Sequence, residues 1–275
     1  MKKFILFAII IFVFGQNVFA GFPVGKGRFK IVPSYNLYRA KGYWDKNGDY
    51  TAYTDNGRFT SNYFGIFVSA GISRNFDFVA TLPIVIQTSS ETNKLVTNAG
   101  LGDISLGLSY FLSHFDENTH LSLTGSLIIP GYQNTILPYI GFGSFGTEVK
   151  LGISGSTQRY YRNPYFDIEG GIRQYFNTFG PTQLFANITG GIPLSDEVKI
   201  SGNLSGVSSQ SNGAVFSTNP NFASYNREFS YIRFTANAGF TINPIWSLWA
   251  NIYTDVAGKS IGKGSGLSIF AVIKL

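Results

Sequence analysis

Two features of the chain predict an all-β fold, a transmembrane antiparallel up-and-down β-barrel of about 12 strands. The first is alternation: in Tyr231–Ile242, apolar side chains occupy every second position and polar ones the positions between. Strand side chains alternate between the two faces of a sheet, so one face is apolar and the other polar. The second is composition, with 13% charged and 16% aromatic residues. Few charges with many Tyr and Phe favour a surface that meets lipid.

The N-terminus has the layout of a secretory signal peptide. Two lysines precede the apolar run Phe4–Phe14, and Val18–Ala20 ends in the small residue expected before cleavage. The run is shorter than the roughly 20 residues that a membrane-spanning helix needs. We expect residues 1–20 to be removed and residues 21–275 to form a single barrel domain. A retained N-terminal anchor is the alternative.

Composition excludes several other classes. The chain has no cysteine, so neither a lipoprotein anchor nor a disulfide framework is expected. Its 21 basic residues include two in the signal peptide, so 19 remain against 15 acidic residues, a net charge of +4. They form no basic stripe, so no nucleic-acid partner is expected. With two histidines and no cysteine, we expect no metal and no cofactor.

Alternating segments predict the strands in order, and each is long enough to cross an apolar band at a tilt. No later apolar run approaches the 18 or so residues of a membrane-spanning helix, which excludes a helical membrane protein. The predicted strands cover residues 28–45, 58–73, 76–88, 100–113, 118–130, 144–158, 164–176, 182–194, 197–208, 228–242, 245–257 and 265–275.

Short and long connections alternate along the chain. The short ones include Ser73–Asn75 and Asn243–Pro244. This rhythm is typical of bacterial outer-membrane barrels, which have tight periplasmic turns and longer external loops. The expected location is therefore the outer membrane of a Gram-negative-type bacterium, with lipid as a partner and both termini periplasmic. The longer connections are Lys46–Gly57, Ser89–Ala99, Gly131–Gly143, Asn177–Pro181, Ser209–Arg227 and Gly258–Gly264.

The odd or even position of a residue along its strand, which we call its parity, also predicts which side chains face the lumen. A charge facing lipid near the bilayer midplane costs about 2 to 4 kcal/mol, so charged positions are assigned inward. A turn at Asn243–Pro244 places Arg233 opposite Asp255, and folding at Tyr160 places Glu148 near Arg173. The candidate lumen-lining residues are Asp103, Glu148, Lys150, Asp167, Glu169, Arg173, Arg233, Trp249, Tyr253 and Asp255.

Two interpretations of these residues stay open. The charged pairs are either struts that close a narrow barrel or parts of a solute path. Trp249 and Tyr253 either fill the barrel or form a hydrophobic ligand site. Pro83 lies inside a predicted strand and lacks a backbone N–H, so a kink or bulge with a local gap in the wall is a further hypothesis.

Catalysis is not expected. A membrane-embedded lipid hydrolase needs a His beside a Ser at the lipid surface. The two histidines are His114, in a predicted turn, and His120, at the start of the next strand. Both belong to the periplasmic end, and His120–Gly125 offers no adjacent serine with a supporting amide. The hydrolase interpretation would return only if His120 lay beside a serine at the lipid surface.

Three segments carry a resemblance to a known family. FGIFVSAGISRNFDFVATLPIVIQ (Phe64–Gln87), GLGDISLGLSYFL (Gly100–Leu112) and LSLTGSLIIPG (Leu121–Gly131) occur in this order. The chain resembles the outer-membrane barrel family of the MetA-pathway phenol-degradation type, which is related in architecture to long-chain fatty-acid channels. The resemblance implies passive uptake of hydrophobic or aromatic small molecules.

Both ends of the chain depart from related barrels. Fatty-acid channels have a long N-terminal plug, whereas only Gly21–Gly27 precedes the first predicted strand, which argues against a gated hatch. The last residue is Leu275, where such barrels usually have an aromatic residue that the barrel-assembly machinery, the expected folding partner, recognises.

The sequence therefore predicts a monomeric outer-membrane channel for passive uptake of small hydrophobic or aromatic solutes. The main alternative is a structural or surface-interaction barrel with an occluded lumen, in which Ser209–Arg227 contacts a partner. A lumen continuously lined by Trp249, Tyr253 and their neighbours would favour transport. A lumen plugged by charged and aromatic groups would favour the structural role.

Overall fold

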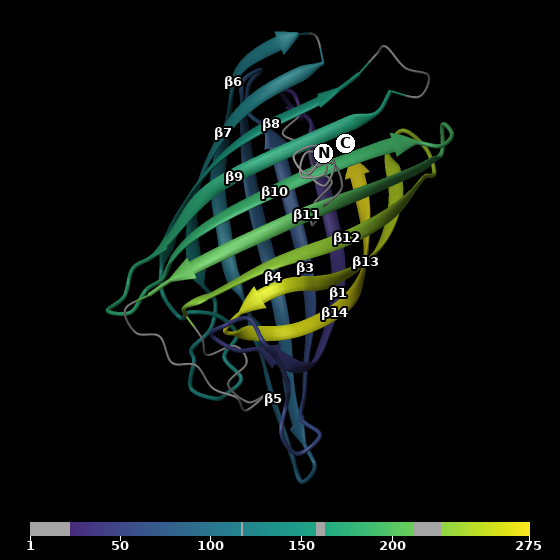
Figure 1. The fold of residues 1–275 in the computed structure, drawn as a ribbon. Helices are drawn as coiled ribbons and strands as arrows, with labels where there is room; N and C mark the ends of the chain where they lie inside the picture. Colours follow the sequence, from purple (N-terminus) through teal and green to yellow (C-terminus); the bar gives the residue numbers. More distant parts are fainter. Residues whose placement is uncertain (1–22, 117, 158–162, 212–226) are drawn as a thin grey trace, which may run out of the picture.

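The computed structural model describes residues 23–116, 118–157, 163–211 and 227–275. Twelve of the strands in these ranges form one closed antiparallel barrel with up-and-down topology (Figure 1). Closure comes from the pairing of β14 (Ile261–Lys274) with β1 (Phe29–Trp44). The predicted fold class is confirmed, whereas the predicted signal peptide lies outside the described residues. No helix among the described residues is long and apolar enough to span a membrane.

The strand order around the barrel follows the chain. Two further strands extend hairpins beyond the wall at one end: β2 (Tyr50–Ala52) pairs with β1, and β5 (Lys94–Leu101) pairs with β4 (Phe76–Glu91). The other wall strands are β3 (Arg58–Gly71), β6 (Asp103–Asp116), β7 (Thr119–Pro130), β8 (Gly146–Ser156), β9 (Tyr165–Tyr175), β10 (Thr182–Pro193), β11 (Val198–Gln210), β12 (Phe229–Thr241) and β13 (Trp246–Lys259).

The connections at residues 72–75, 194–197 and 242–245 lie at the same end of the barrel as the two ends of the described chain, and we call it the turn end. The backbone N–H of Phe29 donates to the carbonyl of Leu275 at 2.8 Å, and that of Leu275 donates back. Residues 23–27 fold across this end, where the Val24 N–H donates to Asp77 Oδ2 at 2.9 Å. Gly71 allows this approach, because a Cβ there would lie 1.9 Å from the Gly25 carbonyl oxygen. We call the opposite end, which carries β2 and β5, the loop end.

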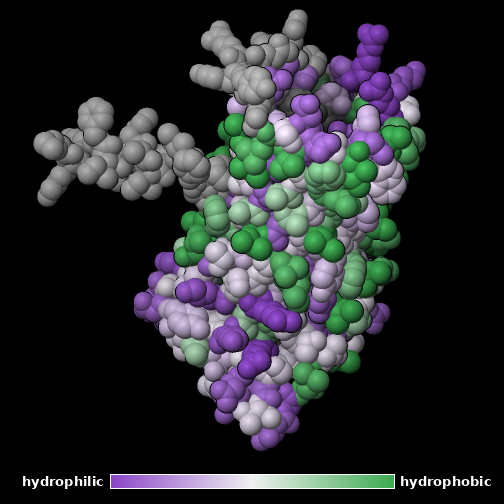
Figure 2. Space-filling model, turned by 90° about the vertical axis from the view of Figure 1, so that its right-hand side faces the viewer, coloured by the Kyte–Doolittle hydropathy of each residue, from purple (hydrophilic) through white to green (hydrophobic). Residues whose placement is uncertain are grey.

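Alternation sorts the side chains as predicted. On β13, Leu248 and Ile252 face outward with 50% and 68% of their surface exposed, whereas the inward Trp249 and Tyr253 keep 9% and 4%. Hydrophobic surface covers the middle of the barrel wall, and hydrophilic surface is broadest toward the loop end (Figure 2). Such a belt is the surface that a lipid bilayer requires.

The predicted loop Ser89–Ala99 is wrong. β4 continues to Glu91, which pairs with Lys94 at the start of β5, so the segment is a tight hairpin. Its tip is tied to the neighbouring connection by the Thr92 N–H, which donates to the Asp55 carbonyl at 3.0 Å. This hairpin projects beyond the apolar belt, so neither of its faces needs to be apolar. Its sequence is therefore rich in Ser and Thr, which led to the prediction of a loop.

The predicted loop Gly258–Gly264 is also wrong, since β13 and β14 are separated by Ser260 alone. Glycines favour this stretch because inward-facing rings occupy the space that side chains would need. A Cβ at Gly264 would lie 2.4 Å from the Tyr38 ring, and one at Gly258 would lie 2.5 Å from the Trp44 ring. Close contact with aromatic rings therefore explains why this segment is rich in glycine, a composition that otherwise indicates a turn.

Pro83 marks an irregularity on one side of its strand. Its ladder with β3 is unbroken, and Pro83 pairs there with Gly65. On the other side, regular pairing ends at Thr81, opposite Ser105 of β6, and resumes at Ile84, opposite Leu101 of β5. The Gly102 N–H donates to the Pro83 carbonyl at 2.8 Å and bridges the interruption. The ladder is thus interrupted beside Pro83 on one side only, and a backbone hydrogen bond spans the interruption.

Candidate functional site

Three ion pairs cross between neighbouring strands inside the described barrel. Arg233 Nε lies 2.7 Å from Asp255 Oδ1, and Arg173 Nη2 lies 2.5 Å from Glu148 Oε2. Both pairs are directly opposite in the strand register, which confirms the two predicted pairings. Lys150 Nζ lies 2.8 Å from Glu169 Oε1. Because buried charges need partners, these pairs keep most of the lumen close to neutral.

Arg233 is held in an aromatic cage. Its guanidinium lies 4.6 Å from the Tyr253 ring centroid and 5.3 Å from those of Tyr38 and Tyr231. The Tyr38 hydroxyl donates to Asp255 Oδ2 at 2.9 Å. The bulge residue Val256 follows Asp255, so the register shifts beyond this contact. Tyr253 therefore packs against a cation and also faces the lumen.

Asp103 anchors the connection between β7 and β8 at the loop end. The Tyr132 hydroxyl donates to Asp103 Oδ1 at 2.7 Å, and the Tyr175 hydroxyl donates to Oδ2 at 3.2 Å. The Tyr132 oxygen also accepts from the Gly143 N–H at 3.0 Å. Burial, followed by the nearby Asp103 charge, raises the pKa of Tyr132 well above its ordinary value. Tyr132 thus stays protonated and able to donate.

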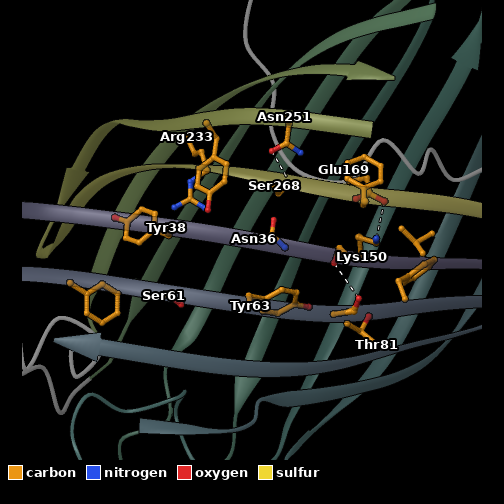
Figure 3. A pocket seen from close by; sticks show the side chains of 17 residues that line it. Asn36, Tyr38, Ser61, Tyr63, Thr81, Lys150, Glu169, Arg233, Asn251 and Ser268 are labelled. Atoms are coloured by element: carbon orange, nitrogen blue, oxygen red, sulfur yellow. Dashed lines mark hydrogen bonds and ion pairs between the residues drawn. The ribbon is translucent and has the colours of Figure 1, made fainter. Parts of the chain in front are cut away.

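Two cavities lie inside the barrel wall. The first, of about 440 Å³, is bordered mainly by β1, β3, β13 and β14, with Arg233, Lys150 and Glu169 among its lining side chains (Figure 3). The second, of about 350 Å³, contains Asp103, Glu148 and Arg173 in its lining. Phe67, Thr81, Lys150 and Glu169 line both cavities. These four side chains form the partition between the two cavities.

A third cavity, of about 560 Å³, opens at the turn end and is called the mouth below. Its lining includes Trp249 and Val272. Together with Val32 these residues form a buried apolar cluster, against which Phe67 and Phe270 pack. The Trp249 and Phe270 rings are stacked with centroids 5.9 Å apart. Since Phe270 lines the first cavity and Trp249 the mouth, this apolar cluster lies between them.

The ten candidate residues thus fall into three groups. Asp167 and Asp255 are buried in the inner wall, with 2% and 4% of their surface exposed. Trp249 lines the mouth. The candidates that line the first or second cavity are Asp103, Glu148, Lys150, Glu169, Arg173, Arg233 and Tyr253.

Sequence reasoning missed three inward lysines at the turn end. Lys30, Lys199 and Lys274 line the mouth. Their parity could have revealed them, because Lys274 shares the face of the buried Val272 and Lys199 that of the buried Ser201. They lie at the ends of strands, where few neighbouring residues on the same strand establish the alternating pattern.

The serine opposite His120 does not lie at the lipid-facing surface, which is where a lipid hydrolase would need it. The cross-strand partner of His120 on β8 is Ser154, which is fully buried on the inner face. The Ser154 hydroxyl donates to Asp167 Oδ1 at 2.5 Å and is thus engaged as a donor. Among the described residues, no group of three or more His, Cys, Asp or Glu side chains could hold a metal ion.

Known structures share this arrangement of strands. The COG4313 outer membrane channel from Pseudomonas putida F1 matches with a TM-score of 0.71 and 14% identity, over 95% of this chain and 99% of that chain. The two chains therefore share a fold, the closed antiparallel up-and-down β-barrel. The translocator domain of the autotransporter NalP from Neisseria meningitidis matches with a TM-score of 0.51 and 13% identity, over 90% and 88% of the two chains.

The sequence comparisons give no family. No family model matches the chain, and no curated protein matches it. The similarity to known structures therefore concerns the fold, and the role of this barrel has to be argued from its own lumen.

Proposed function

We propose that this barrel is an outer-membrane channel of a Gram-negative-type bacterium that lets small hydrophobic or aromatic solutes cross by passive diffusion. In this proposal the turn end faces the periplasm and the loop end faces the exterior. The COG4313 protein, which has the same fold, is an outer membrane channel and supports such a role, and the apolar belt supplies the lipid-facing surface. Contact with the barrel-assembly machinery during insertion belongs to the same proposal.

The apolar cluster between the first cavity and the mouth carries the proposal. Val32, Trp249 and Val272 are at most 9% exposed, and rings from Phe67 and Phe270 complete the barrier. A hydrated sugar or an inorganic ion has no apolar body and would only lose water on passing such side chains, whereas a solute with an apolar ring gains contact area. The cluster therefore favours aromatic solutes over sugars of similar size.

The aromatic-lined first cavity gives a solute a place to pause. Its volume of about 440 Å³ lies within the range of small-molecule sites, roughly 300 to 1,000 Å³. Asn36, Asn251 and Ser268 contribute polar groups to the same lining. The cavity thus suits a ring that carries one or two polar substituents.

A barrel with an occluded lumen is the second candidate. The observation that favours it is the partition between the cavities, in which the Lys150–Glu169 ion pair occupies lumen space together with Phe67. In that case the wall would serve as a platform for the loop end. Transport measurements separate the two roles.

The test is entry of phenyl glucoside and maltose into liposomes that contain the refolded protein. Both solutes consist of two linked six-membered rings, and only phenyl glucoside carries an aromatic ring. We expect phenyl glucoside to enter faster. Equal rates would indicate a general pore and contradict the proposal, and no entry through protein shown to be folded would indicate the occluded barrel.

A further inference from the structure

Three strands place a lysine on the inward face at the turn end. Lys30 on β1 and Lys274 on β14 are direct partners in the strand register, and Lys199 lies on β11. All three line the mouth, and Arg28 joins them there. Like charges directly opposite on a sheet destabilise it, so this arrangement needs a physical reason.

The mouth has an excess of positive charge. None of the described residues that line it has an acidic side chain, and its carboxylate is the terminal one of Leu275. Asp77 and Asp167 act electrostatically on Lys30 from outside this lining. Lys199, Lys274 and Arg28 therefore carry most of the surplus, in contrast to the ion-paired cations deeper in the lumen.

Apolar groups stand beside these cations. Trp249 and Val272 form the inner wall of the mouth, and Val24 lies across it. A cation cluster in a low-dielectric opening attracts anions, and an aromatic or aliphatic wall attracts an apolar body. The volume of about 560 Å³ accommodates one small ligand.

We propose that the mouth selects small anions with an apolar body, such as aromatic sulfonates and carboxylates. The inference rests on the proposed channel function and specifies its substrate class. An apolar ring passes the cluster around Trp249, and its anionic group meets Lys199 and Lys274. Hydrophobic cations of the same size meet repulsion at the same place.

The test compares benzenesulfonate with phenyltrimethylammonium, because both are permanently charged and cross pure lipid poorly. Liposomes containing the folded protein should admit the sulfonate at least about threefold faster. The Lys199→Gln/Lys274→Gln variant should lower this ratio clearly, because of the four lining cations only Arg28 and Lys30 then remain. The matched control is Lys26→Gln/Arg74→Gln, which removes the same charge from exposed residues that lie outside the mouth lining, and it should keep the wild-type ratio.

The outcomes separate this inference from the channel function. If phenyl glucoside enters but the two ions enter equally, or the cation enters faster, the channel stands and the anion preference is overturned. If no solute enters, the channel function fails. Calorimetric titration of the folded protein with benzenesulfonate then decides whether the mouth binds aromatic anions. Binding that weakens at least about threefold in the Lys199→Gln/Lys274→Gln variant supports the anion site, and absence of binding overturns it.

Discussion

Arg233 and Asp255 face each other across β12 and β13, with Arg233 Nε 2.7 Å from Asp255 Oδ1 inside the barrel. The carboxylate side chain is 3% exposed and the guanidinium side chain 17% exposed. Around them, Tyr38 donates to the carboxylate and Tyr253 packs against the cation. The pair is thus a polar joint between two strands, surrounded by rings.

Asp255→Asn should destabilise the barrel strongly. Removing one partner leaves the Arg233 charge buried without its counterion, which costs about 3 to 5 kcal/mol. The free energy of unfolding, measured by urea titration in lipid vesicles, should fall by that order. Arg233→Met/Asp255→Leu removes both charges and should lose much less. Equal losses in the two variants would show that the ion pair itself is not the cause.

Trp249→Ala should open the apolar cluster and weaken discrimination between solutes. The ring is stacked on Phe270 between the first cavity and the mouth, so its loss gives hydrated solutes a wider passage. Maltose entry and ion conductance should rise while the preference for phenyl glucoside falls. The control is Ile252→Ala on the lipid-facing side of the same strand, where the side chain is 68% exposed. A wild-type solute ratio in Trp249→Ala would refute a selective role for the cluster.

Lys150→Ala/Glu169→Ala should join the first and second cavities. Both side chains line both cavities, and removing them together leaves no unpaired charge. Phenyl glucoside should then enter severalfold faster, as measured by liposome swelling. Lys150→Met/Glu169→Leu removes the charges but keeps much of the volume, and it should change entry little. If this second variant matches the first, charge rather than bulk forms the partition.

Asp45 should make the connection after β1 sensitive to acid. Its carboxylate accepts from the backbone N–H groups of Asn47 and Asp49 at 2.8 and 2.9 Å. The Asp49 hydrogen bond is the main cause that lowers the pKa of Asp45. A lowered pKa means that the stabilisation is present at neutral pH and is lost as pH falls through the folded-state pKa, which lies below that of a free carboxyl group. Hydrogen exchange followed from pH 6 downward should show that the protection of these two amides falls in acid, and Asp45→Ala should remove this pH dependence.

Much of the fold follows from the sequence because alternation is a local property. Parity alone assigned Leu248 outward and Trp249 inward, and the turn at Asn243–Pro244 fixed the register that pairs Arg233 with Asp255. Which residues face each other on two neighbouring strands depends on the turn that joins them and on the distance of each residue from that turn. Register predictions therefore succeed where the turn is short and unambiguous.

The cavities and the glycine-rich hairpin could not be obtained in this way. The β13–β14 hairpin depends on rings such as Tyr38, whose distance from Gly264 is a three-dimensional fact. Similarly, Lys30 and Lys199 lie far apart in the sequence and meet at the mouth only after closure. Lumen shape depends on how far side chains reach across the barrel, which an alternating pattern does not encode.

Tyr132→Phe should release the connection between β7 and β8 at the loop end. The hydroxyl donates to Asp103 at 2.7 Å and accepts from Gly143 at 3.0 Å, so its loss removes both contacts at once. A hydrogen bond to a charged group contributes about 1.5 to 3 kcal/mol, and Asp103 would keep only the weaker contact with Tyr175. Amides in Gly131–Gly143 should exchange faster with solvent, with the barrel strands unaffected. Tyr50→Phe, at an exposed loop-end position, should leave their exchange unchanged. Unaltered exchange in Tyr132→Phe would show that the backbone and other contacts hold this connection without the Asp103 anchor.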